Sequence, residues 1–348
     1  MDIIAVSSSP KSVAPPFYNH RVVDVMKMIL ERSSLSAGCW YPHAYYQALK
    51  EKGQNERLQW LQDRDYFFHG FLDVKFFRHT SGHATSPTGK LTEFEIQEGV
   101  KPSEAMDQIF KTLALVDCSN TCQMAQYQVI REAIGNEKFD HLFAGRLIIG
   151  DYMNPKNPLR HFLRPCHDGS HKILLALKRF REGVINDPLL GERNLLQEPA
   201  VIPIGARVVF QNVGRYTSKH PVGPSAGFNV IYLGEDSYYA FGISSEPVTA
   251  RAINTYLMKA FNAPPQAPEH LGPKATNWYN NNRYRFEPFA AAQVKDFSKE
   301  NGGFSPLSGK ALDKELIDWI INTPIEELSW EAVISFRSSS LAESQKQS

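Results

Sequence analysis

The sequence has few cysteines and almost no excess of charge, and both absences narrow the possible functions. It holds four cysteines in 348 residues, at irregular spacing that does not resemble the disulfide framework of a small secreted protein. Lysine and arginine number 38 against 37 aspartates and glutamates, so the formal net charge is +1. A chain this close to neutrality has no general attraction for nucleic acid or for anionic membranes. We therefore expect neither as a partner.

Long apolar runs are also missing. No stretch approaches the ~20 consecutive apolar residues that cross a bilayer. The serine- and proline-rich N-terminus lacks the positively charged start and apolar core of a signal peptide. These features predict a cytoplasmic protein in a reducing compartment. The serine- and glutamate-rich C-terminal tail would also fit an effector secreted without such a signal, although an ordinary disordered terminus is the simpler explanation.

The pattern of apolar residues and turn residues divides the chain into segments. The predicted segments are a flexible N-terminus (1–20), an N-terminal helical extension (21–69), a catalytic domain (70–262), a C-terminal helical extension after a Pro-rich linker (263–336) and a disordered tail (337–348). Inside the central domain we expect a hairpin, a short helix that begins near Pro102 with Ser103 as N-cap, and a long helix after Asp117. Later residues predict a further helix (172–185), an antiparallel sheet (202–243) and a closing helix (249–261).

Asp117-Cys118-Ser119 is the most informative stretch, because it joins an apolar, strand-like run to a long helix. The unpaired N–H groups and positive dipole end of a helix N-terminus favour a thiolate, and the thiolate is the reactive form of cysteine. Cys118 is therefore a candidate nucleophile. The alternative is a buried core cysteine, which is the commoner state of a lone cysteine.

A zinc site is not favoured. Cys122 lies one turn after Cys118, and Cys166-His167 and His171 could add ligands. However, no CxxC pair accompanies them and their spacing is irregular. We therefore expect no metal and no cofactor.

The strand-loop-strand order of residues 202–210 and 229–234 resembles that of papain-like NlpC-type hydrolases, as does the Asp-Cys-Ser opening. A more extensive resemblance is to the bacterial spore-coat type of protein-glutamine γ-glutamyltransferase, the Tgl family. It covers roughly residues 70–261 and rests on colinear stretches: 89–95, 101–105, Asp117-Cys118, 134–139, 210–212, 227–236 and 239–243. The resemblance implies an α+β fold with a papain-like, NlpC-type core: a nucleophile-bearing helix packs on a small antiparallel sheet, with extra helices at both ends.

The same resemblance implies a thiol acyltransferase. Cys118 matches the family's nucleophile, which attacks a glutamine side chain of a protein substrate; a lysine amine, or water, then resolves the thioester. Asp117 matches an acidic residue that precedes the nucleophile and acts as a base, where the family usually has Glu. The alternative role for Asp117 is a helix N-cap. The family's second acid lies in a Gly-Glu-Asn motif, whereas this chain has Gly227-Phe228-Asn229.

Because Phe228 cannot accept a proton, another base is needed. His220 is the best candidate, since it lies in a Gly/Pro-rich loop between two predicted strands and the ordinary histidine pKa of about 6.5 suits a general base. Its alternative is a solvated loop histidine. Asn229 either orients that base or bonds a strand edge. Three functions stay open: a transglutaminase or deamidase, an NlpC-type cysteine peptidase or amidase, and a catalytically inactive binding protein on the same fold.

Overall fold

The antiparallel sheet predicted for residues 202–243 is present and is larger than expected. The computed structural model describes residues 17–31, 33–86, 89–152, 154–165, 202–213, 216–295 and 309–346. The sheet has six strands in the order β10-β9-β8-β7-β11-β6, every adjacent pair antiparallel. Its strands are β6 (Leu163–Pro165), β7 (Arg207–Gln211), β8 (Gly227–Gly234), β9 (Ser237–Tyr239), β10 (Val248–Thr249) and β11 (Gly309–Leu312).

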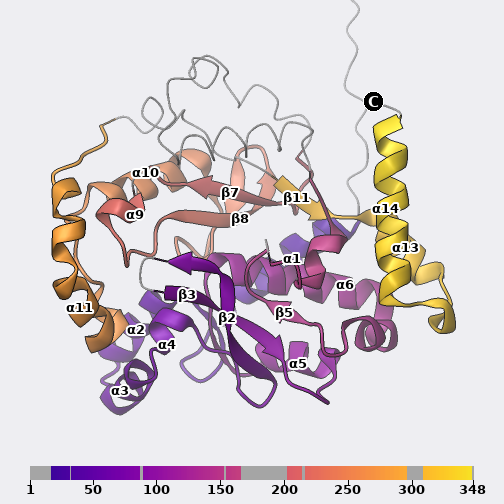
Figure 1. Ribbon diagram of the computed structural model, residues 1–348, viewed down its shortest axis with the longest axis horizontal. Helices are drawn as coiled ribbons and strands as arrows, with labels where there is room; N and C mark the ends of the chain where they lie inside the picture. The colour runs from indigo at the N-terminus through magenta and orange to yellow at the C-terminus, as the bar shows by residue number, and fades with distance from the viewer. Residues whose placement is uncertain are drawn as a thin grey trace, which may run out of the picture.

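Helices cover both faces of this sheet (Figure 1). On one face, alternate residues of β8, Phe228 and Val230, share a core with Ile253 and Leu257 of α10 (Ala250–Asn262). On the other face, Ile231 joins the core formed by α1 (Phe17–Glu31) and α6 (Cys118–Phe143). This arrangement follows from the period of two in a strand, which sends successive side chains to opposite faces. The predicted α+β fold, with the Cys118 helix packed on an antiparallel sheet, is confirmed.

The start of α6 is fixed by the segment before it. The three residues of β4 (Leu113–Leu115) are all buried and pair in parallel with β1 (Gly38–Trp40). Asp117 then leaves the strand and caps the helix. The helix is interrupted at Gly135, whose φ of 80° lies outside the helical region. Cys118 is thus held at the junction between a buried strand and a helix N-terminus.

The predicted hairpin is also confirmed. β2 (Phe77–Ser86) pairs with β3 (Gly89–Ile96), and β3 pairs with the short β5 (Ile148–Ile149). α4 (Tyr66–His69) precedes the hairpin. One detail differs from the prediction. The N-cap of α5 (Pro102–Ile109) is Lys101 rather than Ser103, because Ser103 lies inside the helix and donates to Asp140 from its backbone N (2.6 Å) and hydroxyl (2.8 Å).

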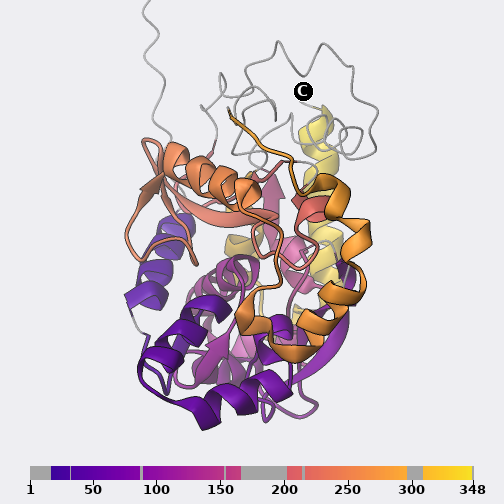
Figure 2. The ribbon, with the colours of Figure 1, turned by 90° about the vertical axis from the view of Figure 1, so that its left-hand side faces the viewer.

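The additional helices lie mostly at the two ends of the molecule, with α11 at one end and α14 at the other (Figures 1 and 2). They are α2 (Pro42–Glu51), α3 (Asn55–Asp63), α9 (Tyr216–Lys219), α11 (Gly272–Asn281), α13 (Lys314–Asn322) and α14 (Trp330–Lys346). Short 3-10 turns occur at Pro158–Phe162, Glu269–Leu271, Arg283–Arg285, Glu287–Phe289 and Ile325–Glu327. Within the described part of the chain, no helix combines the length and apolarity needed to cross a membrane.

The C-terminal region differs from the prediction in two ways. We expected only helices after residue 263, but β11 inserts between β7 and β6 in the central sheet. Residues 337–346, which we predicted as part of a disordered tail, belong to α14 in the structure. Arg337 explains part of this difference, since it is buried and bonds Asp313 and the Leu163 carbonyl. The predicted helix at 172–185 and residues 1–16 lie outside the described residues.

Gly205 joins the β7–β8 region to α1 and allows no side chain. Its φ is +84°, and a Cβ there would lie 1.6 Å from the Asn19 carbonyl oxygen. Asn19 cannot move aside easily, because its side chain bonds both the N–H and the carbonyl of Leu312 in β11. We expect Gly205→Ala to lower the free energy of unfolding by about 3 kcal/mol or more, measured by urea unfolding.

Gly53→Ala is the matched control. Its φ is +65°, but nothing lies within 4 Å of the added atom, so the change should lower the free energy of unfolding by only about 1 kcal/mol. Equal losses in the two variants would contradict the close contact.

Candidate active site

Cys118 lies at the open edge of the central sheet. β9 pairs with β8 only from Ile231 onward, so the backbone N–H of Asn229 points out of an edge that β9 does not cover. The Cys118 sulfur occupies that position: it accepts from the Asn229 backbone N at 3.3 Å and from Asn229 Nδ2 at 3.8 Å. The structure thus brings together two residues that the sequence singles out, from α6 and from β8.

The surroundings of Cys118 favour the protonated thiol over the thiolate. Burial and, to a smaller extent, the adjacent Asp117 carboxylate raise the pKa of Cys118, the two Asn229 donors act in the opposite direction, and the net pKa is about 12. Burial alone raises the pKa of Cys39 to about 12 as well. What distinguishes Cys118 is therefore its hydrogen-bond donors and its neighbours. Its reaction as a nucleophile requires a group that removes the thiol proton.

Asp117 caps the helix that carries the sulfur. Its Oδ1 accepts from the backbone N of Asn120 at 2.8 Å, so the N-cap role is confirmed. Burial raises the pKa of Asp117, backbone N–H groups of Ser119 and Asn120 oppose the rise, and the Asp151 carboxylate adds to it. A carboxyl group with a raised pKa is a stronger base once ionised. Asp117 can therefore serve as a cap and also accept a proton.

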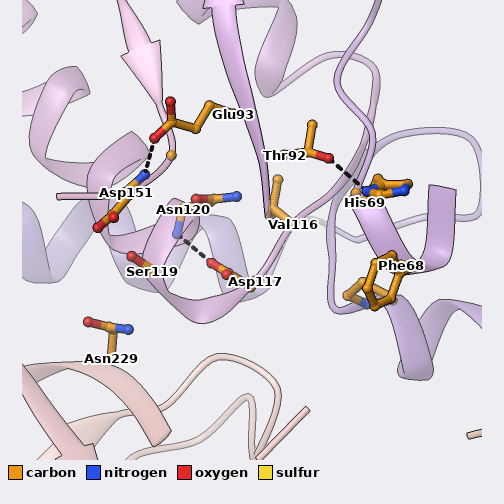
Figure 3. Close-up of a pocket in the computed structure, with 13 residues that line it drawn as sticks. Phe68, His69, Thr92, Glu93, Val116, Asp117, Ser119, Asn120, Asp151 and Asn229 are labelled. Carbon is orange, nitrogen blue, oxygen red and sulfur yellow. Dashed lines mark hydrogen bonds between the residues drawn. The ribbon is translucent and has the colours of Figure 1, made fainter. Parts of the chain in front are cut away.

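A cavity of about 280 Å³ opens beside Asp117 and Asn229 (Figure 3). Its walls come from the helix starts and strand ends that surround the cysteine. The lining residues are Pro42, Phe68, His69, Gly70, Thr92, Glu93, Val116, Asp117, Ser119, Asn120, Gly150, Asp151 and Asn229. Cys118 lies between two of these residues in the chain and is bonded to a third. Cys118 itself is not one of the lining residues, so the cavity lies against the neighbours of the sulfur and not against the sulfur.

Three of the polar lining residues were missed by sequence reasoning. Glu93 is 2% exposed and accepts from the backbone N of Asp151 (3.1 Å) and from Asn154 Nδ2 (2.7 Å). His69 Nδ1 bonds the Thr92 hydroxyl at 3.0 Å, and burial lowers its pKa, which favours the neutral ring. Glu93 lies in one of the stretches that resemble the Tgl family. Asp151 and His69 carry no such signal, because only the tertiary fold brings them to the cysteine.

His220, the predicted base, lies elsewhere. Its ring stacks on Tyr216, with the centroids 4.9 Å apart, and its Nε2 bonds the Phe261 carbonyl at 2.9 Å. It is buried, and burial lowers its pKa. His220 is not among the residues that line the cavity, so neither the predicted base nor its alternative, a solvated loop histidine, describes it. Asn229 does bond a strand edge, but its partner there is the Cys118 sulfur.

Phe228, which the resemblance aligns with the family's second acid, is fully buried. Its ring stacks on Tyr41 (centroids 6.3 Å apart) and meets Tyr256 edge-on (5.3 Å). An aromatic box of this kind suits a phenyl ring and not a carboxylate. The residue that departs from the Gly-Glu-Asn motif, Phe228, is therefore part of a packed core.

None of the described residues forms a group of three or more His, Cys, Asp or Glu side chains that could hold a metal ion. Cys122 is fully buried on α6. The other conceivable zinc ligands, Cys166, His167 and His171, lie outside the described residues.

Comparison with known proteins agrees with the resemblance found in the sequence. The family model described as protein-glutamine gamma-glutamyltransferase matches residues 85–263, just over half of the chain. Among solved structures, a transglutaminase from Geobacillus stearothermophilus, without its C-terminal extension, is similar at 14% identity and a TM-score of 0.46, covering 88% of this chain and 95% of that chain. A search of curated proteins gave no match. The extent of the family match shows that this chain belongs to the protein-glutamine gamma-glutamyltransferase family.

Proposed function

We propose that this protein transfers the acyl group of a protein glutamine side chain to a primary amine, with Cys118 as the nucleophile. The observation that carries the proposal is the position of the Cys118 sulfur, which lies at a helix N-terminus and is bonded by Asn229, while both chain neighbours of Cys118 line a cavity. Family membership supports glutamine transamidation in general. The choice of cysteine and the order of the steps are our own inference.

The proposed reaction has two halves. In the first, Asp117 takes the thiol proton, the sulfur attacks the carboxamide carbon, the C–N bond breaks, and ammonia leaves with the proton. In the second, the amine of the acceptor attacks the thioester carbon and gives a proton to Asp117, the C–S bond breaks, and Asp117 returns that proton to the departing sulfur. The Asn229 N–H groups stabilise negative charge as it develops on the sulfur.

The lining of the cavity fits the arrival of an amine. Asp117, Asp151 and Glu93 place three carboxyl groups on its walls, and opposite charge draws a lysine ammonium towards such a cavity. The amine must lose a proton before it attacks. The neutral ring of His69 and the carboxylate of Asp117 are both available for this proton within the cavity.

The direct test combines a glutamine-rich protein with a labelled primary amine and measures both amine incorporation and ammonia release. We expect both, in a one-to-one ratio when the amine is saturating. Ammonia release without incorporation would indicate a deamidase. Release of peptide fragments would instead support an NlpC-type peptidase, and absence of all three products would refute an enzyme of this kind.

The variant Asp117→Asn distinguishes the helix-capping role of Asp117 from its proposed role as a base. Asparagine caps helices as well as aspartate does, so we expect the fold to be kept. Because the proton acceptor is lost, kcat for transfer should fall by about 10²- to 10⁴-fold. Since the Asp117 carboxylate raises the pKa of the thiol, alkylation of Cys118 at fixed pH should become faster in the same variant. Wild-type kcat in Asp117→Asn would exclude Asp117 as the base.

A second candidate is a binding protein that has lost catalysis. Phe228 favours it, because the family's acid is missing, and so does the raised pKa of the Cys118 thiol. Labelling with a thiol-reactive probe separates the two candidates. An enzyme should show Cys118 labelling that is blocked by a glutamine substrate, whereas an inactive binding protein should show labelling no faster than that of the buried Cys39.

A further inference from the structure

Arg207, on β7, lies behind the pair formed by Cys118 and Asn229. We propose that Arg207 is a positioning residue for the reaction: it holds the side-chain amide of Asn229 in the orientation that donates to the Cys118 sulfur. This inference rests on the proposed function in so far as it concerns turnover. The arrangement of the three side chains is independent of it.

The register of the sheet places Arg207 within reach of Asn229. Arg207 is paired with Ile231 across β7 and β8, and Val209 is paired with Asn229. Arg207 and Asn229 are therefore diagonal neighbours on one face, a separation that a long side chain can cross. Arg207 Nη1 donates to Asn229 Oδ1.

The chemistry of the guanidinium determines which way the amide faces. Arginine has five N–H donors and no acceptor, so only the oxygen of the Asn229 amide can face it. The Nδ2 group must then point the other way, where the Cys118 sulfur lies at 3.8 Å. Without Arg207, the amide could rotate by 180° and present its oxygen to the sulfur, which would repel a thiolate.

Arg207 is buried, with one favourable contact to an aromatic ring and several unfavourable features around it. It is 7% exposed, and its guanidinium carbon lies 3.9 Å from the centre of the Tyr152 ring. Across β7 and β11 it faces Lys310, another cation; like charges opposite each other in a sheet are unfavourable. Burial, together with Arg207 and Arg160, lowers the pKa of Lys310 to about 8. Among the described residues, no carboxylate lies within 4 Å of the Arg207 guanidinium, and its Nε is buried without a hydrogen-bond partner.

A buried cation without a carboxylate partner destabilises a fold, so packing alone does not account for arginine here. Apart from the Tyr152 ring, its one side-chain hydrogen bond among the described residues goes to Asn229, the hydrogen-bond partner of the nucleophile. The other charged or titratable groups that face the sulfur are Asp117 and Cys122 from α6 and Tyr41 from the segment before α2. None of them can orient the Asn229 amide from the β7 side.

The test has two measurements. The first is the rate at which iodoacetamide alkylates Cys118 at different pH values, read by tandem mass spectrometry so that alkylation of Cys118 is distinguished from alkylation of Cys122. The second is kcat and KM for amine incorporation. The first variant is Arg207→Met, which keeps the length and removes the charge. Asn229→Ala and the double variant Arg207→Met/Asn229→Ala complete a cycle. Arg21→Met is the matched control, because Arg21 bonds Glu132 far along α6.

We expect Arg207→Met to raise the pH midpoint of alkylation and to lower kcat by about tenfold or more, with KM within about twofold, as for the loss of a single donor at a reacting centre. In the Asn229→Ala background, Arg207→Met should add little, since a residue that acts through Asn229 has nothing left to orient.

Wild-type alkylation and kcat in a folded Arg207→Met would overturn the inference, as would a full additional loss in the double variant. If Arg207→Met does not fold, Arg207→Gln takes its place, because it also removes the charge and can present an amide oxygen to Asn229; wild-type alkylation and kcat in that variant would overturn the inference. If the wild type incorporates no amine, the proposed function fails, and the alkylation measurements alone decide the role of Arg207.

Discussion

Cys118→Ala is expected to abolish amine incorporation, with a loss of about 10⁴-fold or more in kcat, because removal of a covalent nucleophile leaves only binding and charge stabilisation. The change deletes one sulfur atom from a residue that is 6% exposed. The fold should therefore survive, with a change in unfolding free energy of about 1 kcal/mol. The measurement is the rate of labelled-amine incorporation at saturating substrate.

Cys39→Ala is the matched control. Cys39 is also buried, in β1, and burial raises its pKa to about 12, as in Cys118. The Asn229 backbone N and side-chain amide donate to the Cys118 sulfur instead. We expect wild-type activity from this variant, and equal activity of the two alanine variants would show that Cys118 is not the nucleophile.

Asp313→Ala is expected to produce the largest loss of stability, about 3 to 5 kcal/mol, because it leaves a buried cation unpaired. Asp313 is 1% exposed, and its Oδ2 accepts from Arg164 Nε at 2.6 Å and from Arg337 Nη1 at 2.8 Å. Its Oδ1 accepts from the backbone N of Leu316 at 3.3 Å and caps α13. One carboxylate thus joins β6, α13 and α14. Urea unfolding followed by tryptophan fluorescence measures the loss.

Glu315→Ala provides the comparison for Asp313→Ala. Glu315 also pairs with Arg164, at 2.7 Å, but its side chain is 66% exposed. An exposed ion pair contributes about 1 kcal/mol or less, so this variant should unfold close to wild type. Similar losses from Asp313→Ala and Glu315→Ala would mean that the buried network does not hold the C-terminal helices to the sheet.

The parts of the fold that could be predicted were those encoded by local periodicity. α6, α10 and the strands β7 and β8 were all recognised, because their apolar residues recur with the period of a helix or a strand. β11 was not, since Gly309–Leu312 has only four residues and becomes a strand by pairing with β6 and β7, far away in the sequence. The helical continuation through Arg337 likewise depends on Asp313, a tertiary contact that the polar composition of the tail concealed.

The candidate site divides in the same way. Asp117 and Cys118 could be found because adjacent residues at a strand-to-helix junction leave a local signal, and Asn229 because it lies in a recognisable strand. His220 was a reasonable candidate from loop composition, but the Phe261 carbonyl and the Tyr216 ring hold it away from the sulfur. Arg207 and Asp151 came only with the structure, since register and loop packing bring them to the cysteine.

The most direct test of the central claim is to trap the acyl-enzyme. The protein is mixed with a glutamine-containing peptide in the absence of amine, quenched in acid within seconds, digested and analysed by tandem mass spectrometry. Our account predicts an adduct on Cys118 with the mass of the peptide less ammonia, removed by hydroxylamine as a thioester should be, and absent from Cys118→Ala. Ammonia release that proceeds with no adduct on Cys118 under any quench time, or an adduct on another residue, would contradict the assignment of Cys118 as the nucleophile.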